Sequence, residues 1–124
     1  MRRVRIWDRV AENMKPMELA LKYMEIFFCG EDIDELSHLF AEDLTFRGPL
    51  YETNSAQDYI NSLKSDPPRG FAYEIIGSFE DSSSARLVYR FTKPGVSTLM
   101  AQLFEVRDDK ISKIVLVFDT GALT

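Results

Sequence analysis

Apolar residues recur every three or four positions in the first half of the chain, which is the spacing of one buried helix face. Pro16 suits the first position of a helix and Gly30 suits its end. The sequence therefore predicts a helix over 16–29. Its predicted apolar stripe consists of Met17, Leu21, Met24 and Phe28. The stripe is flanked by Ala20, Tyr23 and Phe27.

A second helix is predicted to begin at Asp32, because Glu35 three residues later completes a pattern that resembles a capping box. The apolar positions expected to be buried are Ile33, Leu36, Leu39 and Phe40. Residues 44–47 then favour an extended segment, which the Gly-Pro pair at 48–49 ends. A third helix is predicted after Asn54 or Ser55, and the run at 66–70 stops it.

The apolar period changes to two from Phe71 onward, which is typical of strands with one buried face. The predicted strands and turns are a strand from 71, a turn at 80–84, a strand through 87–91, a turn at 94–95, a strand over 98–106, a turn at 108–109 and a strand over 111–119. The element order predicts an α+β fold in which a curved sheet wraps around the helices and encloses a pocket.

Strand alternation places one set of side chains on the face toward the helices. That set is Met100, Gln102, Phe104, Ile114, Leu116 and Phe118, which Leu87, Tyr89 and Phe91 can join. The opposite face is also apolar, at Leu99, Ala101, Leu103, Val115 and Val117. An antiparallel sheet with one wet face should alternate more cleanly. We therefore predict a homodimer formed through the sheet.

Gln102 is an uncharged amide in the middle of an apolar strand. If buried it must be hydrogen-bonded, because a lost partner costs on the order of 1–3 kcal/mol. Two interpretations stay open at this point. In one, the amide faces the pocket and a ligand or an ordered water completes its bonds; in the other, it is purely structural.

The 124 residues are enough for one domain, and the net charge of −5 is unevenly placed. Residues 1–15 hold five cationic and two anionic side chains, so they carry +3 and the rest carries −8. They are predicted to be an N-terminal extension of a 16–124 domain. The acidic body argues against a nucleic-acid partner. There is no apolar run long enough to span a membrane, and the single cysteine, Cys29, is expected to be buried in a reducing, cytoplasmic protein.

Several kinds of chemistry lack the residues they need. His38 is the only histidine, it lies off the predicted buried stripe, and it is expected on the surface. No glycine-rich phosphate loop and no calcium-loop spacing occur. The sequence thus predicts neither a metal site nor a cofactor.

The segments 21–26 and 39–46, with Gly30 between them and Gly48-Pro49 after them, resemble the nuclear transport factor 2-like superfamily. The hairpin over 104–118 fits the closing hairpin of that superfamily, so the resemblance spans 16–119. Steroid Δ-isomerases, SnoaL-type polyketide cyclases and limonene epoxide hydrolase belong to it. The resemblance implies a cone-shaped mixed or antiparallel sheet around three N-terminal helices, but the scaffold hosts many activities.

Carried over from the isomerases, the resemblance places Tyr23 where a tyrosine hydrogen-bonds the developing enolate. Gln102 falls where a second oxyanion donor stands, and an amide can still donate. The catalytic base falls on Gly48, or on Arg47 if the register slips by one, and neither is a base. Isomerisation of that type therefore lacks its proton-shuttling group in this chain.

Asp119 is the remaining candidate for acid/base catalysis, because some cyclases and epoxide hydrolases of the superfamily use a strand-borne aspartate. Alternation points it away from Phe118, so the competing interpretation is a surface carboxylate that pairs with Arg86 or Arg90.

The functional hypothesis is an apolar pocket for a small hydrophobic molecule with a carbonyl or hydroxyl group, with isomerase-, cyclase- or hydratase-type chemistry if there is any. The alternative is an association module without a ligand. Tyr23 and Asp119 are the candidate catalytic residues. The predicted ligand-binding residues are Tyr23, Phe27, Phe46, Tyr59, Tyr89, Met100, Gln102, Phe104, Leu116 and Phe118.

Overall fold

The computed structural model describes residues 14–123, so the predicted extension over 1–15 lies almost wholly outside the described residues. The elements in chain order are α2 (Pro16–Cys29), the 3-10 helix η1 (Ile33–His38), β1 (Phe40–Arg47), β2 (Glu52–Thr53), α3 (Ala56–Ser65), β3 (Ala72–Glu80), β4 (Ser84–Lys93), β5 (Val96–Arg107), β6 (Lys110–Phe118) and the 3-10 turn η2 (Thr120–Leu123). The predicted α+β class is confirmed.

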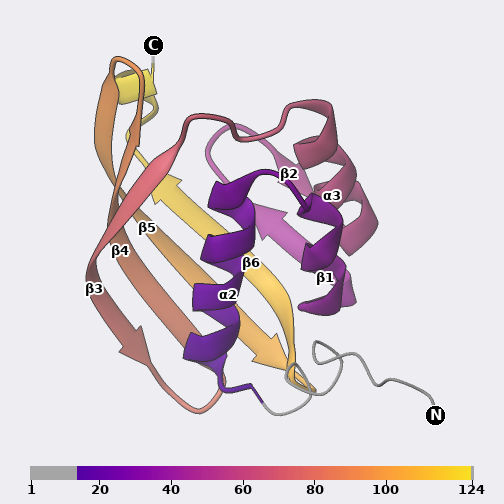
Figure 1. Cartoon of the computed structure of the whole chain (residues 1–124). Coiled ribbons are helices and arrows are strands. Elements are labelled where there is room, and N and C mark those ends of the chain that lie inside the picture. The colour runs from indigo at the N-terminus through magenta and orange to yellow at the C-terminus, as the bar shows by residue number, and fades with distance from the viewer. Residues whose placement is uncertain (1–13, 124) are drawn as a thin grey trace, which may run out of the picture.

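The six strands form one curved sheet that does not close (Figure 1), in the order β2-β1-β6-β5-β4-β3. Only β1 and β6 pair in parallel, and the other neighbours are antiparallel. Helix α2 lies across one face of this sheet, and α3 stands beside β1 (Figure 1). The face toward the helices holds the core, and its side chains follow the predicted alternation.

Helix α2 has the predicted bounds because both of its ends are specified locally. Pro16 occupies the first turn, and the backbone N–H of Lys15 donates to Glu18 at 3.1 Å. Gly30 ends the helix in the left-handed region, at φ 72°, and its N–H donates to the carbonyl of Ile26. Helix α3 begins after Ser55, whose side chain accepts from the N–H of Asp58 at 3.0 Å.

The second predicted helix differs from expectation. It is a six-residue 3-10 helix, and Asp32 makes no side-chain cap bond. The stripe that suggested it continues into β1, where Phe40 is a buried strand residue. The third helix follows two strands, so the expected set of three N-terminal helices is not confirmed, and neither is the cone shape.

The buried face of α2 is also rotated from the predicted stripe. Leu19, Tyr23 and Met24 are its buried centre, whereas Leu21 is 36% exposed. Cys29, at the last position of the helix, is exposed, so its predicted burial is wrong. Within residues 14–123, no helix combines the length and the apolar character needed to cross a bilayer.

Candidate functional site

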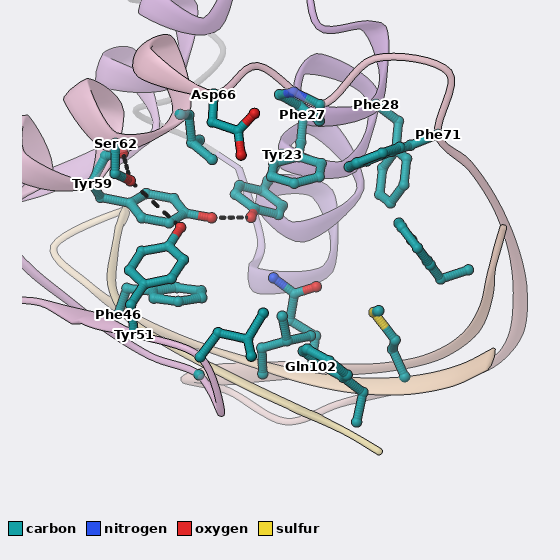
Figure 2. A pocket seen from close by; sticks show the side chains of 18 of the residues that line it. Tyr23, Phe27, Phe28, Phe46, Tyr51, Tyr59, Ser62, Asp66, Phe71 and Gln102 are labelled. Carbon is teal, nitrogen blue, oxygen red and sulfur yellow. Dashed lines mark hydrogen bonds between the residues drawn. The ribbon is translucent and has the colours of Figure 1, made fainter. Parts of the chain in front are cut away.

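A cavity of about 430 Å³ lies between the helices and the inner face of the sheet. Helix α2 provides one wall, α3 and the segment that follows it another, and strands β4, β5 and β6 the floor (Figure 2). The lining is mainly aromatic and aliphatic, with a small number of polar side chains among them. This composition is typical of small-molecule sites.

Polar side chains of the walls and of the floor form one connected network. The hydroxyls of Tyr23 and Tyr59 lie 2.5 Å apart, and both side chains are buried. Tyr89 donates to the amide oxygen of Gln102 at 2.7 Å. The Gln102 side chain also lies near the Tyr23 hydroxyl and lowers its pKa. Two strands and two helices are thus joined through four side chains.

Burial raises the pKa of Tyr23, Tyr59 and Tyr89 well above the usual value for a phenol, because desolvation disfavours the phenolate. At Tyr23, interactions with the side chains of Tyr59 and Gln102 partly offset this effect of burial. At Tyr59 the charge of an ionised Tyr23 adds to it. All three hydroxyls are therefore neutral near pH 7.

The direction of these bonds decides what Tyr23 can do. Either hydroxyl of the Tyr23–Tyr59 pair can donate to the other, and in the arrangement in which Tyr59 donates, the Tyr23 oxygen accepts. The proton of Tyr23 is then available to an acceptor in the cavity. The oxygen of Gln102 is satisfied by Tyr89. Gln102 thus positions two tyrosines, and a ligand is not needed to explain its burial at 4% exposure.

Aromatic stacking holds the wall beside this network. The ring of Phe46 stacks on that of Tyr59, with centroids 4.6 Å apart and planes at 19°. On its other side Phe46 contacts Tyr51 at 5.1 Å, and Ser62 donates to the Tyr51 hydroxyl at 3.5 Å. The mouth of the cavity lies near Tyr51, which is 41% exposed.

Comparison with solved structures identifies this architecture. An NTF2-like protein of unknown function from Cytophaga hutchinsonii superimposes with a TM-score of 0.77, at 20% identity over 90% of this chain and 96% of that one. The chain has the NTF2-like fold. A candidate ketosteroid isomerase from Kribbella flavida gives 0.72, at 21% identity over 82% and 76%. An LEH-like epoxide hydrolase from M. tuberculosis gives 0.66, at 19% over 85% and 86%. No family model matches the sequence, and no curated protein matches it either.

Nine of the ten predicted ligand-binding residues line the cavity of this NTF2-like chain. They are Tyr23, Phe27, Phe46, Tyr59, Tyr89, Met100, Gln102, Leu116 and Phe118. Phe104 does not line it. Its ring is fully buried and meets the Tyr23 ring edge-on, with centroids 5.2 Å apart, so it supports Tyr23 from behind.

Gly48, the position to which the sequence resemblance assigned the base, lines the cavity and carries no carboxylate. A Cβ on Gly48 would lie 3.0 Å from carbons of the Phe46 ring, so a larger residue there would require that ring to shift by a few tenths of an ångström. Arg47 is bound to the carbonyls of Phe46 and Thr53 and to Asn54, and it does not line the cavity.

Asp119, the other candidate catalytic residue, lies outside the cavity, and so does His38. Asp119 is exposed beyond the end of β6, and its carboxylate accepts from the N–H of Gly121 at 2.9 Å, which fixes the turn η2. Neither Arg86 nor Arg90 is its partner, since they contact Asp81 and Ser97. His38 is partly buried and lies 3.4 Å from Glu35. No cluster of three metal-ligating side chains occurs in residues 14–123.

Sequence reasoning missed part of the lining. Phe28, Phe71 and Phe91 close the end of the cavity opposite Tyr59, and Asp66 and Lys93 add two charges. Strand alternation had already placed Phe91 on this face. Nothing in the pattern indicated Asp66, because a polar residue before two prolines predicts only the end of a helix.

Proposed function

We propose that the protein binds a small hydrophobic molecule with a carbonyl or hydroxyl oxygen in this cavity, and that the Tyr23 hydroxyl is its anchor. The observation that carries the proposal is the buried Tyr23 hydroxyl, which lines the cavity 2.5 Å from the Tyr59 hydroxyl and directs its own proton to a ligand when Tyr59 donates to it. A preorganised neutral phenol in a dry environment is a strong donor to a carbonyl oxygen. The apolar walls would supply most of the binding free energy.

Isomerase- or cyclase-type chemistry fits this arrangement. Hydrogen bonds to a carbonyl oxygen stabilise the negative charge that develops when a neighbouring C–H bond is broken. The names of the Kribbella and mycobacterial structures support this direction, at the level of fold alone. The cavity also favours ligand binding over the alternative, an association module without a ligand.

The test uses a matched pair of bicyclic probes, the ketone 2-tetralone and the hydrocarbon tetralin, titrated calorimetrically at pH 7. The wild-type protein should prefer the ketone. Tyr23→Phe should lower the ratio of the affinities for 2-tetralone and tetralin about five- to tenfold, as expected for the loss of one neutral hydrogen bond. The affinity for tetralin should hardly change, since the ring of Tyr23 is retained.

Tyr73→Phe is the matched control, because Tyr73 is half-buried near Phe28 but does not line the cavity. It should leave both affinities unchanged. Equal preference for the ketone in wild type and Tyr23→Phe would remove the anchor role. Absence of binding by both probes would argue for the association module.

We also propose that two copies pack through the outer face of the sheet. Leu99 and Val117 on that face are 50% and 60% exposed. The register sets Ala101 opposite Val117 and Leu103 opposite Val115, so the apolar positions of β5 and β6 are contiguous. Contiguous exposed apolar surface on a folded chain is typical of an interface.

A further inference from the structure

Asp66 is the one carboxylate in the lining of the cavity, counting the residues that the structure describes. It follows α3 as its C-cap residue. The residue before a proline is disfavoured in helical conformation. Pro67 therefore ends α3 at this point, and Asp66 adopts φ −143° and ψ 74°. The same backbone change turns the carboxylate toward the cavity rather than along the helix surface (Figure 2).

The Asp66 carboxylate has no committed partner. Between residues 14 and 123 it makes no hydrogen bond or ion pair, unlike Asp43 and Asp81, which each bind an arginine. Lys93 also lines the cavity, but it lies over the ring of Phe71 and forms no ion pair with Asp66 within 4 Å. An aspartate that is neither paired nor engaged as a cap has both oxygens available to a ligand.

Asp66 is exposed at the edge of the cavity, close to its aromatic wall. Burial raises the pKa of Tyr51, and the negative charge of Asp66 adds to this effect. The ring of Tyr51 packs on Phe46, which in turn stacks on Tyr59. Figure 2 shows the carboxylate directed to the side of the cavity where the hydroxyls of Tyr23 and Tyr59 meet. An oxyanion donor and an unpaired carboxylate thus face one apolar space, which is the pair of groups that proton abstraction beside a carbonyl requires.

We infer that Asp66 is the general base of this site, acting on a hydrophobic ketone whose oxygen is held by Tyr23. This inference rests on the proposed function. It gives the cavity the proton-transfer group that Gly48 lacks and that Asp119, outside the cavity, does not provide. The substrate class is a carbonyl compound with an acidic C–H bond next to the carbonyl carbon.

The step is a balanced proton transfer. The C–H bond breaks and its proton passes to the Asp66 carboxylate. The electron pair of that bond forms a carbon–carbon double bond, and the carbonyl π pair becomes the oxyanion that the Tyr23 proton stabilises. The protonated Asp66, which is exposed, exchanges its proton with solvent, so that return of a solvent-derived hydrogen to the same carbon completes hydrogen exchange. Return of a proton to a conjugated carbon isomerises the substrate. No oxidant or reductant is consumed.

The experiment measures exchange of the protons next to the carbonyl of 2-tetralone in D₂O by proton NMR, with binding followed on the same samples. Wild-type protein should accelerate exchange over buffer. Asp66→Asn should reduce that acceleration by about 100-fold or more, the usual contribution of a positioned base, and should leave binding of the ketone nearly unchanged. Asp66→Glu, which restores a carboxylate, should recover part of the rate.

Asp58→Asn is the control, since Asp58 lies on the first turn of the same helix and does not line the cavity. It should exchange 2-tetralone at the wild-type rate. Equal rates for Asp66→Asn and wild type would overturn the inference. Binding of the ketone without acceleration by wild-type protein would also overturn it and would leave the proposed binding function standing. Absence of binding would overturn both.

Discussion

Three buried phenols dominate the chemistry of this protein at the scale of single residues. Tyr23, Tyr59 and Tyr89 come from a helix, a second helix and a strand, and Gln102 joins two of them. Each hydroxyl has a partner, so the network avoids the cost of a buried unpaired polar group. When Tyr59 donates to Tyr23, the proton of Tyr23 is directed into the cavity, as the proposed binding function requires.

The raised pKa values predict instability in alkali. A phenol whose pKa is higher in the folded than in the unfolded chain holds its proton more tightly when folded, so its contribution is complete below pH 10 and falls as the pH rises above it. Each of the three tyrosines should remove up to about 1.4 kcal/mol of unfolding free energy per pH unit above 10. Urea unfolding between pH 8 and pH 11 measures this slope.

The same experiment contains its own check. Tyrosinate absorbance of the buried tyrosines should increase only together with the loss of folded structure. Ionisation of all five tyrosines near pH 10 in a chain that keeps its circular dichroism would contradict the burial argument.

Strand periodicity predicts single residues better than helix periodicity in this chain. In a strand, alternate side chains point to opposite faces, so one assigned residue fixes the face of all the others. Gln102, Tyr89 and Met100 were therefore correctly assigned to the cavity side. A helical stripe can rotate by one residue, so Tyr23 was predicted to flank the apolar stripe of α2, whereas it lies at the buried centre of that face. Asp66 was missed because its role depends on where α3 ends relative to α2, which is a tertiary relation.

Between elements, Gly30 at the end of α2 closely approaches the segment after α3. A Cβ on Gly30 would lie 2.6 Å from the carbonyl oxygen of Pro68, and Gly30 already has φ 72°. The end of α2 is thus fixed against the segment that carries Asp66 and Pro68. A side chain at position 30 would push the two segments apart, which should widen the cavity, and it would also strain the backbone.

Gly30→Ala and Gly95→Ala separate these two effects. Gly95 has φ 79°, but a Cβ there meets nothing within 4 Å. Gly95→Ala should therefore lower the unfolding free energy only by the cost of left-handed backbone, about 1–2 kcal/mol. Gly30→Ala carries that penalty and the overlap with Pro68, so its loss in urea unfolding should be clearly larger. Equal losses would show that the close approach is not rigid.

The bounds of elements were predictable where local signals coincide. Pro16 and Gly30 delimit α2, Ser55 caps α3, and Asp108-Asp109 form the predicted tight turn with φ of 53° and 62°. The helix predicted from Asp32 to Phe40 was wrong. Its four apolar residues at helical spacing belong to a 3-10 helix and to the start of strand β1. Local spacing cannot distinguish these, since both bury the same residues against α3 and β6.

For the molecule as a whole, one sheet has two apolar faces with different uses. The inner face lies under α2 and forms the cavity floor, and β5 and β6 contribute to both faces through alternate residues. The alternation that predicted the cavity therefore also predicted the outer patch. Covering that patch would stiffen β5 and β6, which hold Gln102 and Leu116 at the floor of the cavity.

The proposed homodimer can be tested at the centre of this outer patch. Val117→Asp places a charge on the face without touching the cavity, and it should convert a dimer into a monomer, because an unpaired charge in an interface is costly to desolvate. Light scattering after gel filtration at micromolar concentration gives the mass. Ile76→Asp is the matched control, since Ile76 is 55% exposed on β3, away from the patch. A wild-type monomer would refute the dimer, and a Val117→Asp dimer would place its interface elsewhere.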